Sequence, residues 1–575
     1  MILTKLKEKQ IPYLIASKKI KNEVLALLLI GDFFLRKGLV KIKYLRFKRN
    51  RKIISLLRHF PTSADSVLKI ERIAEATIFK TETLLPSLIT KKDFDSHFND
   101  IEDFFKLHRF NWLWSEYLTQ LNPEALQEAL SLILSWISKD YDMEGNKDIF
   151  ESYSISERIT SWIFFLVFSK GVINIDENDI KLISKSIIKQ LNYLAQNLEF
   201  KGQLTNNHIL KNAMALYVGG AFLSDEKIKE LGKVIIIAEY DEHITDGYLQ
   251  EDSTHYQFIV TRWFIEVFHA SKIAKDYEFQ KWLEPRLKNL LGVCRKTFLQ
   301  NGTGPLFGDI SPDFPVETFM SYPFIDIEKK SPWSFLLNGL SASPEVVNTK
   351  IKNVWIHKKI GKFDLFVMAK NKGIGSHGHE DNGSFVLFCE GSALVQDLGR
   401  KDYTGDHISI EQQKQAFHSM PCLGHRPWDI KTIPTIVKSL FISKFNIIQE
   451  SEVLFRYRVS SFDGAAVIER TFQYNLEKEN LILRDKLLSK KSDYVLALPL
   501  DCSADSLALN GSRVSFNTKT QKRYFISSDC KHEVQHSVMS KNYGKQEDCA
   551  LLIFKKSLNP GEFIEYIFGS EDRHD

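Results

Sequence analysis

The sequence predicts an α+β protein of several domains, with an all-helical first part followed by an antiparallel β-sandwich. The 575 residues exceed the roughly 100–200 residues of an ordinary domain. Apolar residues recur at helical spacing up to about residue 340, and beyond Pro344 their period drops towards two. We therefore expect a basic N-terminal segment over 1–60, a helical domain over 61–345 and a β-sandwich domain over 346–575.

The helical interpretation depends on amphipathic stretches joined by short polar connectors. The clearest of these are Ile180–Leu198, Ile209–Phe222 and Tyr256–Ala274. Strands do not alternate with them, so the pattern excludes a Rossmann or TIM-barrel protein.

The second part contains short runs rich in Val, Ile and Phe, separated by turn signals. We expect strands over Lys362–Lys370, Ser384–Cys389, Val453–Val459, Ala466–Tyr474 and Leu551–Lys555. Asn510-Gly511 predicts a type I′ hairpin and Asp463-Gly464 a second one. Many short strands with closely spaced turns are typical of a β-sandwich. The two parts are expected to pack together, and such an interface is a common place for a binding cleft.

The charge of the chain is unevenly distributed. The net charge is +5, yet residues 1–52 contain 15 Lys or Arg and 3 Asp or Glu, a local balance of +12 that leaves −7 for the remainder. The run Lys41–Lys52 fits either a polyanion- or membrane-binding segment or a solvated helix end. The bulk of the protein is therefore not a general polyanion binder, and we expect no nucleic-acid partner.

Nothing at the N-terminus has the pattern of a secretory signal or a membrane span. Ile11–Ala16 is too short for a signal core, and Asp32 ends the apolar run Val24–Ile30 far short of about 20 residues. We expect a cytoplasmic protein without a transmembrane segment, or a periplasmic one if the start site is wrongly assigned. The six cysteines lack the paired spacing of a disulfide framework or a zinc ribbon.

Histidines are concentrated in one short region. Five of the 16 lie between residues 377 and 425: His377, His379, His407, His418 and His425. His377 and His379 precede a predicted strand, and residues at i and i+2 of an extended backbone point to the same side. With Asp397 and His418 they offer the two imidazoles and one carboxylate of a zinc site that keeps a position for water. A polar loop with hydrogen-bonded histidines is the alternative.

Two polar clusters and one arginine stand out in the helical part. Asn207 and His208 immediately precede a predicted helix, where an Asn is either an N-cap or a functional residue. Tyr256 begins another helix, a few residues after Glu251, and such a tyrosine is often only a core residue. Arg158 lies within a third helix, where a surface ion pair is the simple alternative.

These clusters follow one another in a distinctive order: NNH, then DG with ExSxxY, then HGHxDN, then a strand-end DxG, then AxHS. In this order they resemble the heparinase II/III-like polysaccharide lyases, a family that includes heparin and heparan-sulfate lyases, oligoalginate lyases and relatives encoded with surface-polysaccharide genes. The resemblance extends from His108 to about Trp428, with weaker similarity beyond. It implies an incomplete (α/α) toroid followed by a β-sandwich.

The resemblance also implies β-elimination on a uronate-containing polysaccharide. Asn207 and His208 match the residues that neutralise the uronate carboxylate, which the enediolate intermediate requires. Tyr256 matches the general acid, which in some members is also the base. His377 matches the histidine that acts as the base or assists it. The choice between Tyr256 and His377 as base depends on the uronate epimer and stays open.

His379, Asp397 and His418 match the ligands of a zinc ion that braces the loop of the catalytic histidine. Arg158, Glu251 and Tyr403 are the expected substrate-binding residues. The chain departs from the family at Glu380, where an alanine is frequent. It also lacks the RY tyrosine of many oligoalginate lyases, which disfavours alginate as the substrate.

The predicted partner is an acidic polysaccharide or oligosaccharide, and the −7 balance favours a lightly charged one. Two other functions fit parts of the sequence. A glycoside hydrolase on the same toroid would need two carboxylates flanking the bond, with Glu251 and Asp252 as candidates. A glycan-binding accessory protein without catalysis would fit the missing signal.

Overall fold

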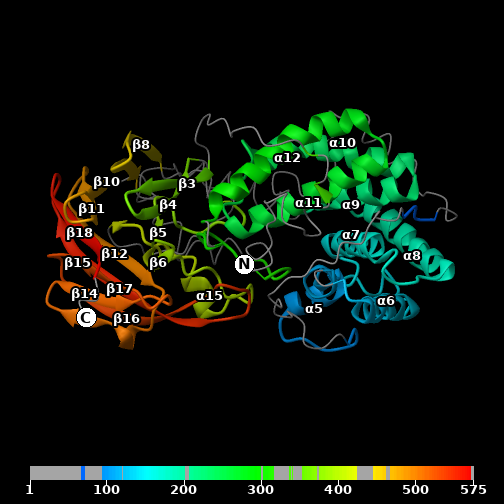
Figure 1. Cartoon of the computed structure of the whole chain (residues 1–575), viewed down its shortest axis with the longest axis horizontal. Coiled ribbons are helices and arrows are strands. Elements are labelled where there is room, and N and C mark those ends of the chain that lie inside the picture. Colours follow the sequence, from blue (N-terminus) through cyan, green and yellow to red (C-terminus); the bar gives the residue numbers. More distant parts are fainter. Residues whose placement is uncertain are drawn as a thin grey trace, which may run out of the picture.

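The computed structural model describes part of the chain: residues 67–70, 93–118, 121–200, 206–299, 302–315, 336–337, 340, 353–371, 375–423, 444–460 and 466–571. The predicted basic segment 1–60 and the predicted turn at Asp463-Gly464 lie outside these residues. Figure 1 shows an elongated molecule with the helices gathered in one half and the strands in the other.

The helical half is built from consecutive helices joined by short connections. Its elements are α5 (Ile101–Arg109), the π-helix η3 (Leu113–Tyr117), α6 (Pro123–Ser138), α7 (Ser152–Ser169), α8 (Glu177–Gln196), α9 (His208–Leu223), α10 (Glu226–His243), α11 (Thr254–Ile273) and α12 (Tyr277–Thr297). A two-stranded ribbon, β1 (Ile244–Thr245) and β2 (Tyr248–Leu249), separates α10 from α11.

Helices α7, α9 and α11 form the centre of this half, because nearly all their residues are buried. Around them α6 and α8 are amphipathic and bury one face only. Gly232 of α10 allows close approach to α9, since a Cβ at this position would lie 2.4 Å from the backbone nitrogen of Tyr217. The apolar side chains of these helices form one continuous core.

The other half consists of antiparallel strands. They are β3 (Asn353–Ile360), β4 (Phe363–Lys370), β5 (Phe385–Cys389), β6 (Ser392–Val395), β7 (Cys422–Leu423), β8 (Phe445–Glu450), β9 (Leu454–Ser460), β10 (Val467–Asn475), β11 (Asn480–Leu487), β12 (Ser492–Leu500), β13 (Ala508–Asn510), β14 (Arg513–Asn517), β15 (Arg523–Ser527), β16 (His532–Met539), β17 (Glu547–Leu558) and β18 (Phe563–Ser570). Short helices α15 (His407–Glu411), η5 (Gln415–Phe417) and η7 (Ala504–Ser506) interrupt them.

These strands form three main sheets. The eight-stranded sheet has the order β13-β14-β15-β18-β11-β10-β9-β8, and the four-stranded sheets have the orders β16-β17-β12-β7 and β3-β4-β5-β6. One apolar core joins all three, with Phe385 from β5, Phe472 from β10 and Leu552 from β17 among its members. The strands therefore form a layered sandwich. Burial alternates along β9 and β10, because one side of each strand faces the core and the other does not.

The predicted fold class is confirmed. The three predicted helices correspond to α8, α9 and α11, and the five predicted strands to β4, β5, β9, β10 and β17. One turn prediction is wrong in detail: β13 pairs with β14 through Asn510 and Arg513, so Gly511 and Ser512 form the turn. Only Gly511 has positive φ, whereas type I′ needs it at both positions. The predicted boundary at residue 345 lies outside the described residues.

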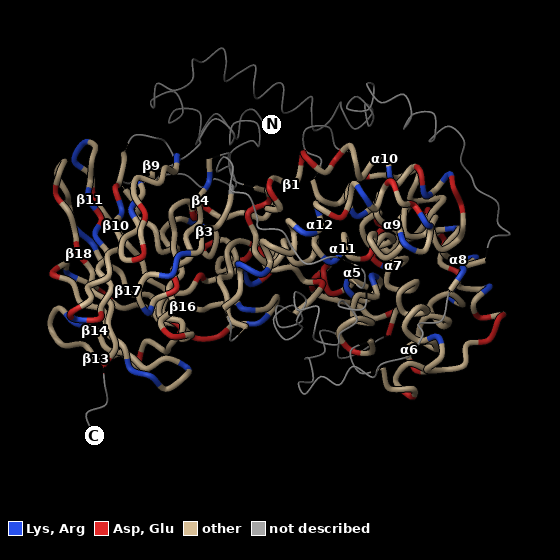
Figure 2. Tube along the Cα trace, turned by 45° about the horizontal axis from the view of Figure 1, so that its top comes forward, with Lys and Arg blue, Asp and Glu red and all other residues tan. Residues whose placement is uncertain are grey.

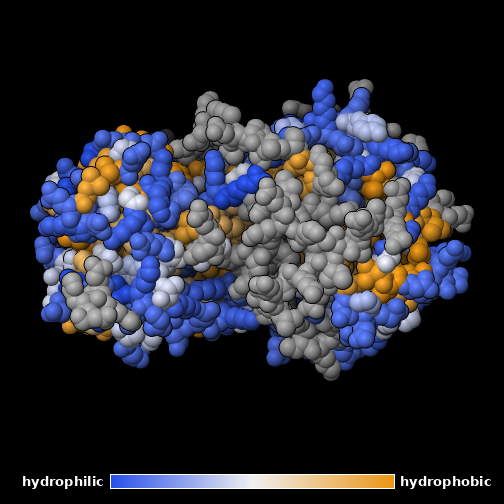
Figure 3. Space-filling view, in the orientation of Figure 1, coloured by the Kyte–Doolittle hydropathy of each residue, from blue (hydrophilic) through white to orange (hydrophobic). Residues whose placement is uncertain are grey.

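The described surface is polar and of mixed charge. In Figure 2 basic and acidic residues are interspersed over both halves. Figure 3 shows a mainly hydrophilic surface over the sheet half. Within the described ranges, no helix combines the length and the apolar character that a membrane crossing requires.

Candidate active site

Several of the polar residues that the sequence singles out meet where a loop of the sheet half lies against the start of α11. The Gly375 backbone N–H donates to Asp252 Oδ2 at 2.7 Å, and the His377 N–H donates to the Glu251 carbonyl at 3.2 Å. Gly375 permits this contact, since a Cβ there would lie 2.5 Å from the Glu251 backbone. The buried Lys370 ammonium is 3.3 Å from the Asp252 carboxylate. Backbone and charge contacts therefore join the two halves at this point.

Tyr256 lies in the first turn of α11, and the Ser253 hydroxyl caps this turn by accepting from the Tyr256 N–H at 3.1 Å. Its phenol oxygen is 2.8 Å from that of Tyr403. Its ring stacks on the His377 imidazole, with centroids 3.6 Å apart and planes at 12°. Burial raises the pKa of Tyr256 well above its ordinary value, although the hydrogen bond from Tyr403 opposes this. The phenol is thus protonated at neutral pH.

His377 lies between two carboxylates. Its Nδ1 is 3.2 Å from Asp309 Oδ2, and its Nε2 is 3.6 Å from Glu251 Oε2. The Arg400 guanidinium donates to the same Asp309 oxygen at 2.7 Å. Burial alone would raise the pKa of Asp309, but hydrogen bonds from His377 and His379 and the charge of Arg400 hold it well below its usual range. An ionised carboxylate therefore faces the candidate base.

Asn207 occupies the position before α9, but its side chain does not cap the helix. Its backbone N–H donates to Glu251 Oε1 at 3.0 Å. The side chain is buried, and neither amide atom has a hydrogen-bond partner among the described residues. A buried amide without partners is costly for folding. The side chain therefore does not act as an N-cap, and its hydrogen-bonding capacity is unused within the described residues.

His208, the next residue, lies on the helical side of the site. Its ring stacks on Tyr153 at 4.5 Å, and its Nδ1 is 3.0 Å from Glu199 Oε1. Tyr153 in turn donates to Asp313, which pairs with Arg109 at 2.8 Å. His208 thus belongs to a charged group on α5, α7 and α9 rather than to the His377 contacts.

His379, Asp397 and His418 come together as the sequence predicts. One ligand atom from each lies within 4.8 Å of the others, and all three residues are buried. His418 Nδ1 is 2.9 Å from Asp397 Oδ2, while His418 Nε2 and His379 Nδ1 have no hydrogen-bond partner within the described part of the chain. Two orphaned imidazole nitrogens beside a carboxylate fit the donor set of a divalent transition metal.

Arg158 lies apart from these residues. It is fully buried in the helical core, where it donates to Gln190 Oε1 at 2.7 Å and to the His108 carbonyl at 2.7 Å. Its guanidinium also covers the Trp136 ring. Burial lowers its pKa to about 9. The predicted substrate contact is corrected accordingly: the structure places this side chain inside the toroid, and the surface ion pair does not form either.

Solved structures provide a direct comparison. The chain superposes on a heparan sulfate lyase, HepC from Pedobacter heparinus, with 16% identity and a TM-score of 0.52, over 92% of this chain and 88% of that one. It also superposes on heparinase III, with 16% identity and a TM-score of 0.56, over 83% and 78%. The chain has the heparinase III fold. No family model and no curated protein matches the sequence.

Within this heparinase III fold, sequence reasoning missed two residues that hold the site together. Asp309 comes from the connection between α12 and β3, which has no periodic pattern. Arg400 follows the predicted ligand Asp397 closely, and its guanidinium covers the Tyr403 ring at 4.4 Å. The sequence does not reveal their role, because Asp309 contacts His377, His379 and Arg400, which are all far away from it in the sequence. The motif Asp397-x-Gly399 was the only available signal, and it pointed to a ligand rather than to Arg400.

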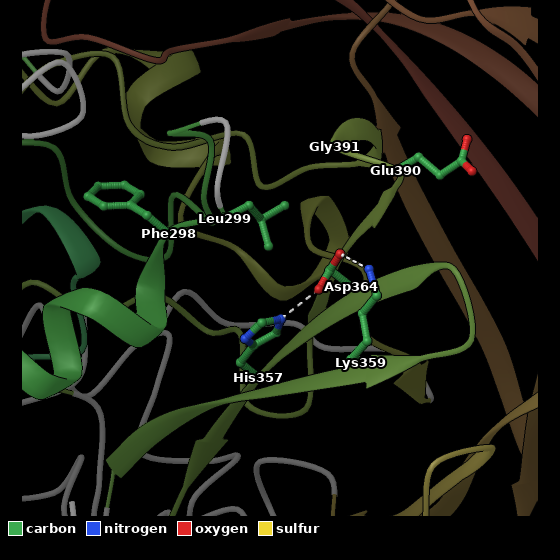
Figure 4. Close-up of a pocket in the computed structure, with 7 residues that line it drawn as sticks. All are labelled: Phe298, Leu299, His357, Lys359, Asp364, Glu390 and Gly391. Atoms are coloured by element: carbon green, nitrogen blue, oxygen red, sulfur yellow. Dashed lines mark hydrogen bonds and ion pairs between the residues drawn. The ribbon is translucent and has the colours of Figure 1, made fainter. Parts of the chain in front are cut away.

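A pocket of about 570 Å³ lies elsewhere, between the end of α12 and the β3–β4 and β5–β6 hairpins. Figure 4 shows the Asp364 carboxylate there between His357 and Lys359, at 2.9 and 2.8 Å. His357 and Lys359 both contact this one acid, and their interactions lower the pKa of Asp364 against the effect of burial. Asp364 thus pairs with both basic residues that line this pocket, and the Glu390 carboxylate pairs with Lys522 at 3.0 Å.

Proposed function

We propose that the chain is a polysaccharide lyase that cleaves a uronate-containing polysaccharide or oligosaccharide by β-elimination. The observation that carries the proposal is Tyr256, a phenol kept protonated by burial and stacked on His377. The Glu251 carboxylate links His377 to Asn207, whose side-chain amide is unpartnered among the described residues. The fold supports it, since the superposed structures are a heparan sulfate lyase and a heparinase III.

In the proposed reaction His377 removes the C5 proton of the uronate, and the electron pair moves into the carboxylate to form an enediolate. The pair then forms the C4–C5 double bond as the C4–O bond breaks. Tyr256 protonates the departing glycosidic oxygen. The high pKa of Tyr256 suits the acid more than the base, and an imidazole suits a base near neutral pH.

Asn207 donates its amide N–H to the uronate carboxylate, with His208 beside it as the second donor. Charge develops on this carboxylate as the C5 proton leaves, so donors fixed in advance stabilise the transition state. Glu199 fixes the ring orientation of His208 through Nδ1. Glu251 is predicted to bind substrate. Because it accepts from the Asn207 N–H and faces His377, we assign it the role of holding these two residues in place.

We further propose a structural zinc ion held by His379, Asp397 and His418. Zinc would fix the loop that carries His377, two residues from His379. The orphaned nitrogens of both histidines support this assignment. Elemental analysis of the purified protein should give one zinc per chain. Asp397→Asn should reduce that ratio and lower the melting temperature, and an unchanged ratio would remove the assignment.

The lyase proposal is tested with a panel of uronate polymers of different sulfation. Cleavage should create unsaturated ends that absorb ultraviolet light, with faster reaction on lightly charged polymers. Cleavage without this absorbance would indicate a hydrolase. That alternative finds little support here, because Asp252 is buried and paired with Lys370 and the Gly375 N–H. Glycan binding without any cleavage would indicate the accessory protein.

A further inference from the structure

Asp309 contacts several parts of the site at once. Its Oδ2 is 3.2 Å from His377 Nδ1, and its Oδ1 is 2.9 Å from His379 Nε2. Its backbone N–H donates to the His377 carbonyl at 2.8 Å, and its carbonyl accepts from the Ser253 hydroxyl at 2.7 Å. One buried residue therefore contacts the proposed base, a proposed metal ligand and the cap of the Tyr256 helix.

The two imidazole contacts determine where the protons lie. A carboxylate only accepts, so His377 presents Nδ1–H and His379 presents Nε2–H to Asp309. In the neutral form of each ring, the opposite nitrogens, His377 Nε2 and His379 Nδ1, carry the lone pairs. Both are buried without hydrogen-bond partners in the described part of the chain. One must accept a proton and the other must bind a metal in the proposed function, and both tasks require a lone pair.

We infer that Asp309 is a positioning residue that sets the tautomers of His377 and His379 together. Arg400 completes the arrangement by donating to Oδ2 at 2.7 Å, which holds the carboxylate in place. The inference rests on the proposed lyase function for its catalytic consequence. The tautomers themselves are properties of the protein without substrate.

The first test uses the unmodified protein. Nitrogen NMR of ¹⁵N-histidine-labelled chain, with His377→Gln and His379→Gln to assign the signals, reports which ring nitrogen carries the proton. We expect Nδ1–H for His377 and Nε2–H for His379. The reverse tautomer at His377 would overturn the inference, whether or not any polymer is cleaved.

The second test is Asp309→Asn, whose single amide oxygen cannot accept from both rings. We expect kcat to fall about 10- to 100-fold, the usual loss for an outer-shell partner, with little change in KM. In a His377→Ala background the same substitution should cost nothing further. A full additional loss in that background would show that Asp309 does not act through His377.

The matched control is Asp364→Asn, which breaks a His–Asp–Lys contact of the same kind in the pocket of Figure 4. It should leave kcat unchanged. If the wild-type protein cleaves no polymer, the lyase proposal fails while the NMR result still decides the role of Asp309. If Asp309→Asn does not fold, the wild-type tautomers remain decisive.

Discussion

Two buried polar clusters of this protein differ in how fully their groups are paired. In the sandwich core, Arg470 donates Nε and Nη2 to the two oxygens of Asp485 at 2.7 and 2.6 Å and Nη1 to the Ser419 carbonyl at 2.8 Å. Tyr494 donates to the same carboxylate. We call Arg470, Asp485 and Tyr494 the Arg470 cluster. Its hydrogen bonds are complete within the protein.

The second group, the Tyr256 cluster, comprises Asn207, Glu251, Tyr256 and His377 at the contact between the halves. Both amide atoms of Asn207, Oε2 of Glu251 and Nε2 of His377 are buried without hydrogen-bond partners among the described residues, and the last two face each other at 3.6 Å. Folding leaves this hydrogen-bonding capacity unused, at a cost in stability. The contrast teaches that the first cluster serves the fold, whereas the second keeps the free polar groups that our proposal assigns to the substrate.

Tyr256→Phe should have the largest effect. It removes the acidic proton and keeps the ring that stacks on His377, so kcat should fall by up to about 10⁴-fold. The melting temperature should change little. Product formation on the best polymer of the panel measures the first, and thermal unfolding the second. Tyr494→Phe is the control, with the opposite pattern of lower stability and normal kcat. Equal losses of kcat in both variants would contradict the comparison.

Arg470→Met should destabilise the protein by roughly 3–5 kcal/mol, because Asp485 is left as a buried charge without its cation. Urea unfolding followed by circular dichroism measures this. Arg470→Met combined with Asp485→Leu should recover part of the loss, since both charges are then absent. Arg470 also donates to the carbonyls of Gly383 and of Ser419, the residue that follows the proposed zinc ligand His418. A stable single variant would show that the pair is not needed.

Asn207→Leu should separate activity from stability. Loss of the donor should reduce kcat/KM about 10²- to 10³-fold, as for other oxyanion donors. Stability should stay the same or rise, because the unpartnered amide is gone. Asn212→Leu on the same helix is the matched control. Asn212 is paired with Glu199 and Ser156, so its loss should lower the melting temperature. A destabilised Asn207→Leu would indicate a structural role instead.

The fold was predictable because periodicity reports which face of an element is buried. The convergence of His379, Asp397 and His418 was predictable through the resemblance, and i, i+2 spacing on an extended backbone placed His379 beside His377. Asp309 was not predictable, because its partners His377 and Arg400 are 68 and 91 residues away in the sequence. The direction in which a helical side chain points also depends on the neighbouring helices. For this reason Arg158 was wrongly assigned to the substrate.

Arg158→Met should have the smallest effect and should concern stability alone. Its guanidinium donates to Gln190 and to the His108 and Ile149 carbonyls, so the variant leaves these acceptors unpaired at a cost of about 1–2 kcal/mol. Part of this loss is offset, because burial lowers the pKa of Arg158 to about 9 and holding its charge at neutral pH is itself unfavourable. KM for any cleaved polymer should be unchanged. A raised KM with normal stability would return Arg158 to the substrate and weaken the distinction between paired and unpaired buried groups.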